Sequence, residues 1–186
     1  MITDNVYQSL FLVYDRGVVV IDAPPGYASR LPQAIAEVSG QPVTHVIYSH
    51  SHVDHIAGVK ALGGSPVIIA QEETGRLLAR AADPRRPPPT VTFADRYVLR
   101  VGTQVLELSY HGDGHEPGNI FIYAPAQQVR TEIAHRCANR QEKMFNVGNR
   151  AVLLVIAAAH LVIPLAECVS AALVAQRLDA FVHERA

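Results

Sequence analysis

Cysteine and net charge are both scarce in this sequence of 186 residues. Its two cysteines, Cys137 and Cys168, form no CxxC pair, which argues against a disulfide framework and against a site built from paired thiolates. A reducing compartment, the cytoplasm, is therefore the expected location. The formal charge of −1 lacks the basic excess of nucleic-acid-binding proteins, so we expect no nucleic-acid partner.

The first residues, MITDNVYQSLFLVYD, carry no basic stretch ahead of an apolar segment. A secretory signal peptide has both features. The alternation of apolar and polar side chains predicts a strand here instead, so we do not expect a signal peptide in this part of the chain.

Up to about residue 125 the chain alternates between strand-like and helix-like segments, which predicts an α/β fold. Apolar and β-branched runs predict strands at 6–14, 18–25, 43–50, 66–70, 96–101, 103–110 and 119–124. Helical patterns occupy residues 30–39, 55–62 and 71–81. The proline-rich stretch DPRRPPPT, residues 83–90, suits neither element, so it predicts an exposed loop with Arg85 and Arg86 in solvent.

Four side chains of the kinds that bind metals crowd the segment YSHSHVDHIAG, residues 48–58. His50, His52 and Asp54 are spaced i, i+2 and i+4 at the end of a predicted strand, and extended backbone turns all three to one side. His55 follows where a helix should begin. Imidazoles with one carboxylate are ligands for zinc first, and for iron or manganese second. The segment therefore predicts a metal site.

A glycine-rich segment, HGDGHEPGN at residues 111–119, offers a further histidine ligand. Glycines near His115 let the backbone turn sharply there, so His115 is the better ligand candidate. We expect His111 to have a structural or supporting role, and Asp113 to be an exposed turn residue.

Taken together, these motifs resemble the signature of the metallo-β-lactamase-fold hydrolases. The HxHxDH pattern of residues 50–55 follows a hydrophobic strand and is followed by Gly58, as in that family. Asp22 matches the family aspartate after the second strand, and GDGHEPGN resembles the loop often written GHTPG. The resemblance covers about residues 5–125 and implies an αββα sandwich that is incomplete at the C-terminus.

The resemblance also implies a ligand set and a chemistry. His50, His52 and His115 would form a first metal site, with zinc as the expected ion, and Asp54 and His55 would begin a second. A metal-bound hydroxide would hydrolyse a small-molecule substrate.

Two carboxylates take supporting roles in the family pattern. Asp54 would act in catalysis by orienting the hydroxide or carrying its proton. Asp22 would steady the histidine loop from behind the ligands.

The C-terminal third departs from this family. No aspartate occurs between Asp113 and Asp179, whereas the family places a metal-bridging aspartate in that part of the chain. The remaining weak ligand candidates are Glu132, His135, His160 and His183. We therefore expect one zinc ion where the family pattern has two, and impaired hydrolysis.

Composition changes at the same point in the chain. Residues 129–186 contain one glycine, one proline and no tyrosine. We therefore divide the chain into a metallo-β-lactamase-like domain at 1–128 and a helical tail at 129–186. A frameshift in the gene or genuine divergence would explain the tail.

The apolar run at residues 151–175 is long enough to cross a bilayer. Pro164 and Glu167 lie within it, so a membrane span is the less favoured structure and a helix that covers the sheet is expected. Three functions stay open: a zinc-dependent hydrolase with impaired activity, a catalytically inactive relative that binds a single zinc ion, and a membrane-tethered or partner-binding protein that uses this run.

Overall fold

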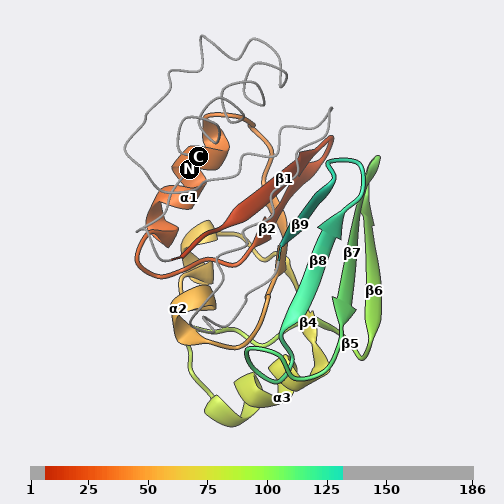
Figure 1. The fold of residues 1–186 in the computed structure, drawn as a ribbon. Helices are drawn as coiled ribbons and strands as arrows, with labels where there is room; N and C mark the ends of the chain where they lie inside the picture. Colours follow the sequence, from red (N-terminus) through yellow and green to blue (C-terminus); the bar gives the residue numbers. More distant parts are fainter. Residues whose placement is uncertain (1–6, 132–186) are drawn as a thin grey trace, which may run out of the picture.

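The computed structural model describes residues 7–131, which form two facing β-sheets with helices packed against the first (Figure 1). The first sheet has five strands in the order β1-β2-β3-β4-β5, and the second has four in the order β6-β7-β8-β9. The strands are β1 Leu10–Tyr14, β2 Gly17–Ile21, β3 Val43–Ile47, β4 Val67–Gln71, β5 Val91–Phe93, β6 Arg96–Val101, β7 Gln104–Tyr110, β8 Ile120–Ala124 and β9 Val129–Thr131. The α-helices are α1 Leu31–Ala36, α2 Val53–Ile56 and α3 Glu72–Ala81, and the 3-10 helices are η1 Ala28–Arg30 and η2 Val59–Leu62.

In the first sheet, strands β2 to β5 run parallel to one another, whereas β1 joins β2 as an antiparallel hairpin. Every residue of β2 is buried, as the continuous apolar sequence of a strand covered on both faces predicts. Because β2 and β3 are parallel, their carboxyl ends meet at the same edge of the sheet. Asp22 follows β2 there, and Ser49 and His50 follow β3.

The second sheet is antiparallel throughout. Its inward side chains, such as Leu99 and Ile122, are buried, while Val98 on the outer face is 47% exposed. The loop between β7 and β8 reaches the same edge as the histidine loop of the first sheet, residues 48–52, which follows β3 and carries His50 and His52. There the Ile120 backbone N–H donates to the Ser49 carbonyl at 3.0 Å.

The first sheet separates two hydrophobic cores. Val20 packs with the helices and Val19 with the second sheet, because successive strand side chains point to opposite faces. The helices contribute Leu31, Ile35, Ile56, Val59, Leu62 and Leu78 to the first core. The second sheet contributes Leu99, Val101, Leu106, Leu108, Ile120, Ile122 and Ala124 to the second core. Each fully buried aliphatic side chain stabilises the fold by about 1.5–3 kcal/mol, so both cores hold the shared edge in place.

The predicted α/β class is confirmed, and a strand lies within or across each predicted strand range. The helix expected at residues 55–62 is instead divided into α2 and η2. Gly58 lies at the division, where its backbone N–H donates to the Ala23 carbonyl at 2.9 Å, outside the helix. A Cβ at this position would lie 2.6 Å from that oxygen, so the close approach requires glycine.

Two strands, β5 and β9, were not predicted, because each has only three residues. Strand β9 pairs with β8 and carries the second sheet three residues past the predicted boundary at residue 128. The rest of the predicted tail, with Glu132, His135, His160, His183 and the apolar run, lies outside the described residues. Within residues 7–131, no helix has the length and apolar character needed to cross a bilayer.

Candidate metal centre

Asp22 and Ser49 hold the start of the histidine loop. Asp22 adopts a left-handed backbone conformation with a φ of 56°, which an aspartate tolerates better than most residues. Its buried carboxylate accepts the Ser49 backbone N–H at 2.9 Å and the Ser49 hydroxyl at 2.5 Å. These two bonds fix the point at which β3 ends and the histidine loop begins.

The Ser49 hydroxyl also determines which nitrogen of His50 carries the proton. Ser49 Oγ lies 2.9 Å from His50 Nδ1, and its own proton is donated to the Asp22 carboxylate, which can only accept. Ser49 therefore accepts the Nδ1 proton of His50. This leaves the lone pair on His50 Nε2, a buried atom with no hydrogen-bond partner among the described residues.

Burial is also the main reason that the pKa of His50 falls to about 3, and the nearby histidines lower it further while Asp22 opposes the change. His50 is therefore neutral near pH 7. A neutral, buried imidazole with an unpartnered nitrogen is the state that a metal ligand requires.

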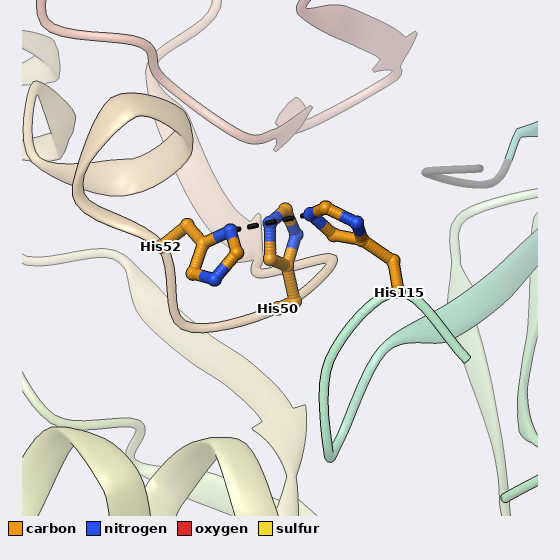
Figure 2. Close-up of side chains that lie close together, drawn as sticks. All are labelled: His50, His52 and His115. Carbon is orange, nitrogen blue, oxygen red and sulfur yellow. Dashed lines mark hydrogen bonds between the residues drawn. The ribbon is translucent and has the colours of Figure 1, made fainter. Parts of the chain in front are cut away.

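His52 and His115 complete a cluster of three imidazoles, which lie close together in Figure 2. His52 precedes α2 in extended backbone, and His115 comes from the loop between β7 and β8. His52 Nδ1 lies 3.2 Å from His115 Nε2, and one ligand nitrogen from each of the three histidines lies within 4.8 Å of the others. Two nitrogens bound to one tetrahedral zinc at about 2.0–2.1 Å are roughly 3.3 Å apart, so the donor set fits zinc.

Asp54 and His55 lie beside the cluster and contact different partners. His55 Nδ1 is 3.5 Å from Asp22 Oδ2, and Asp22, His50 and His55 form a second group of ligand atoms within 4.8 Å. Burial lowers the pKa of His55, but the hydrogen bond and charge of Asp22 outweigh it and the net direction is upward. Asp54 is in neither of the two groups that the described residues form.

Tyr7 supports this side of the centre, although no motif in the sequence indicates a role for it. Its hydroxyl bonds to the Asp54 carboxylate, and its ring meets that of His55 edge-on at 5.1 Å. Burial raises the pKa of Asp54, whereas the Tyr7 bond, the Asp54 backbone N–H, and the charges of His55 and His52 lower it, and lowering prevails. Asp54 is therefore ionised near pH 7.

Glu116 and Arg86 contact the histidine loop and were also missed. Glu116 accepts both the backbone N–H and the hydroxyl of Ser51, at 3.0 and 2.8 Å, and lies 3.3 Å from His52 Nε2. Arg86 Nη1 donates to the Ser51 carbonyl at 2.6 Å. The expectation that Arg86 is only solvated was wrong, because its side chain is 12% exposed. The departure from GHTPG to GHEPG was the one available signal for Glu116.

His111 and Asp113 lie outside the cluster. His111 Nε2 is 3.0 Å from Ser109 Oγ, and its ring contacts Phe121. Asp113 is exposed and accepts a hydrogen bond from the Tyr110 hydroxyl at 2.6 Å. Of the two histidines in the glycine-rich segment, only His115 lies beside His50 and His52.

Comparison with known proteins identifies the family of this chain. The family model described as the metallo-beta-lactamase superfamily matches residues 3–129. The chain belongs to that superfamily, and the resemblance drawn from the HxHxDH and GHEPG motifs is confirmed.

Individual relatives carry different activities in their names. The chain is 31% identical over 132 residues to 2,4-dinitroanisole O-demethylase subunit alpha of Nocardioides sp. (strain JS1661), covering 68% of this chain and 40% of that protein. It is 34% identical over 109 residues to hydroxyacylglutathione hydrolase of Rhodobacter capsulatus, covering 58% and 38%. A solved metallo-beta-lactamase from Pontibacter korlensis matches with a TM-score of 0.59 and 28% identity, over 66% of this chain and 57% of that one. The chain thus spans less than half the length of these two curated relatives.

Proposed function

We propose that this chain holds one zinc ion and belongs to a metal-dependent hydrolase of small molecules. The observation that supports it best is the cluster of His50, His52 and His115, in which a buried nitrogen of His50 has no hydrogen-bond partner within residues 7–131. His50 Nε2, His52 Nδ1 and His115 Nε2 would hold the ion. An all-imidazole set favours zinc, with iron or manganese as alternatives.

Held by these three histidines, a zinc ion would lower the pKa of a water molecule to about 7 and so supply a nucleophile at neutral pH. The protein's own contribution is orientation. Ser49 and Asp22 set the His50 tautomer, and Asp54 provides an ionised carboxylate beside the cluster that can accept a proton. Tyr7 holds that carboxylate through its hydroxyl.

The substrate class is a small molecule with a hydrolysable bond. The relatives are named for an O-demethylase, a hydroxyacylglutathione hydrolase and a metallo-beta-lactamase, so ether, thioester and lactam bonds are the first to test. The scarcity of cysteine supports the cytoplasm as the location, and the charge of −1 supports a partner other than nucleic acid.

A catalytically inactive protein with a single zinc ion is the second candidate. It is favoured by the contacts of Asp54 and His55. Asp54 bonds to Tyr7, and His55 lies beside Asp22. Among the described residues, the two join no further carboxylate that would complete a separate second site. Zinc binding without turnover on an ether, thioester, lactone and lactam panel would favour this candidate.

Zinc content tests both candidates. We expect one equivalent of zinc in the purified wild-type chain and a loss of stoichiometric zinc in His52→Ala, because two ligands rarely hold the ion tightly. His45→Ala is the matched control, since His45 lies on β3, where its Nδ1 bonds to Thr44, and takes no part in the cluster. Unchanged metal content in His52→Ala would refute the ligand assignment.

A further inference from the structure

Glu116 lies on the loop that carries His115 and contacts the loop that carries His50 and His52, and the proposed hydrolysis gives it no role. Its side chain is only 16% exposed. One carboxylate oxygen, Oε2, accepts the Ser51 backbone N–H at 3.0 Å. The other, Oε1, accepts the Ser51 hydroxyl at 2.8 Å and lies 3.3 Å from His52 Nε2. Two donors from Ser51 thus fix the orientation of the carboxylate against His52.

We propose that Glu116 is a positioning residue that keeps the His52 ring in the tautomer whose Nδ1 can bind the metal. This inference rests on the proposed zinc site. Glu116 also joins the two ligand loops, which its contact with Ser51 brings together across 65 positions of the chain.

The two nitrogens of His52 have different surroundings. Nδ1 lies inside the cluster, 3.2 Å from His115 Nε2 (Figure 2), while Nε2 faces Glu116. A neutral imidazole carries one proton, and the nitrogen that carries it cannot bind a metal. Because a carboxylate only accepts hydrogen bonds, Glu116 stabilises the proton on Nε2 and leaves the lone pair on Nδ1.

The family loop written GHTPG has threonine where this chain has Glu116. A threonine hydroxyl is neutral and can donate as well as accept, so it does not impose one tautomer on a neighbouring ring. The carboxylate of Glu116 does impose one. The competing role for Glu116 is purely structural, as a link between the loops through Ser51.

Three variants of the full chain separate these roles. Glu116→Gln removes the charge and keeps the size of the side chain. Ser51→Ala removes the hydroxyl link to Glu116 but leaves the carboxylate beside His52. Glu107→Gln is the matched control, because Glu107 is an exposed glutamate of β7 whose loss changes the net charge equally.

Two measurements apply to each variant: nitrogen NMR of the histidine rings in metal-free protein at about pH 8, where imidazoles are neutral, and zinc affinity by competition with a chelator. We expect His52 to be protonated on Nε2 in the wild type, in Ser51→Ala and in Glu107→Gln. In Glu116→Gln we expect a mixture of tautomers and zinc binding weaker by about 10- to 100-fold, a larger loss than in Ser51→Ala.

An Nδ1-protonated His52 in the wild type, or an unchanged tautomer in Glu116→Gln, would overturn the inference. So would equal losses of zinc affinity in Glu116→Gln and Ser51→Ala, since that result assigns Glu116 only the loop link. If the wild type bound no zinc, the proposed function would fail, whereas the metal-free tautomers would still decide whether Glu116 orients His52.

Discussion

At the scale of single residues, the centre depends on where protons sit as much as on which side chains are present. Ser49 stands between a carboxylate and an imidazole, and its hydroxyl satisfies both in one arrangement only. His50 Nε2 thereby keeps the lone pair that the proposed zinc site requires. Supporting contacts of this kind are worth about 10- to 100-fold in metal affinity.

Replacing Ser49 by alanine should therefore weaken zinc binding by about 10- to 100-fold. It should also lower the free energy of unfolding by about 1–3 kcal/mol, because the buried Nδ1 of His50 would lose its partner and the Asp22 carboxylate would lose one of its donors. Chelator competition and urea unfolding measure the two effects. Ser39→Ala is the control, since its hydroxyl accepts the Gln41 backbone N–H at the surface. Wild-type zinc affinity in Ser49→Ala would contradict the role given to Ser49.

The low pKa of His50 predicts how the metal-free protein responds to acid. The folded-state pKa of about 3 lies below the ordinary value of about 6.5, so between these values the unfolded chain binds more protons than the folded one. Stability should fall as the pH is lowered from about 6.5, by up to about 1.4 kcal/mol per pH unit from this residue. His55, with its raised pKa, acts in the opposite direction: it adds stability below its ordinary pKa, and this is lost as the pH rises through the folded value.

Urea unfolding of the metal-free chain at a series of pH values checks this expectation. The slope of stability against pH between about 4.5 and 6.5 should be smaller in His50→Gln than in the wild type, because glutamine does not titrate. Identical slopes in the two proteins would show that His50 does not carry the effect.

Some residues of the candidate centre could be predicted from the sequence, and others could not. His50, His52 and His115 stand in local patterns with a recognisable spacing. Ser49 and Glu116 act through partners 27 and 65 positions away, and no local pattern shows such a pairing. Tyr7 was missed for the same reason, since its contacts with Asp54 and His55 depend on how the first strand is placed.

At the scale of elements, the loop that carries His115 depends on the start of α3. Gly118 has a φ of 84°, and its carbonyl accepts the Thr74 hydroxyl at 3.1 Å. A Cβ at Gly118 would lie 2.5 Å from Thr74 Oγ1 and 2.6 Å from the Thr74 backbone nitrogen. The close approach and the left-handed backbone both require glycine here.

Gly118→Ala should therefore displace the loop, weaken zinc binding and lower the free energy of unfolding by about 1–3 kcal/mol. Gly114→Ala is a matched control in the same loop, because its Cβ would have no neighbour closer than 3.8 Å and its backbone is not left-handed. Urea unfolding and chelator competition compare the two variants. Equal effects of both substitutions would mean that the contact with α3 does not position His115.

The existence of an element was predictable where its apolar run was long, and the ends of an element were predictable for some strands only. Strands β6 and β7 match their predicted ranges within one residue. The prediction of one helix across residues 55–62 was wrong because the Gly58 backbone N–H bonds to Ala23, which lies 35 positions earlier in the chain. Periodicity describes neighbours in sequence, whereas that contact comes from tertiary packing.

At the scale of the whole molecule, a shared side chain supports the proposal of a single ion. The two groups of ligand atoms among the described residues both include His50, whose Nδ1 is already bonded to Ser49. His50 therefore has one nitrogen for one ion. The chain also lacks an aspartate between Asp113 and Asp179 that could bridge two ions.

Calorimetric titration with zinc should accordingly show one tight site, and Asp54→Ala should keep it. Two tight sites in the wild type would contradict this expectation, and would direct attention to Glu132, His135 and His160 in the part of the chain outside the described residues. Because this titration uses the full chain, a second tight site would also indicate that residues 132–186 supply ligands.

The facing loops of the centre have a consequence for the lifetime of the folded chain. His52 and His115 belong to loops of different sheets and are separated by 63 positions, so an ion held by both is a reversible cross-link between the two halves of the sandwich. Ligand at 100 times its dissociation constant stabilises a folded protein by about 2.7 kcal/mol. Zinc supply in the cell would then govern how often the sheets part and how quickly proteases remove the chain, independently of any reaction that the centre performs.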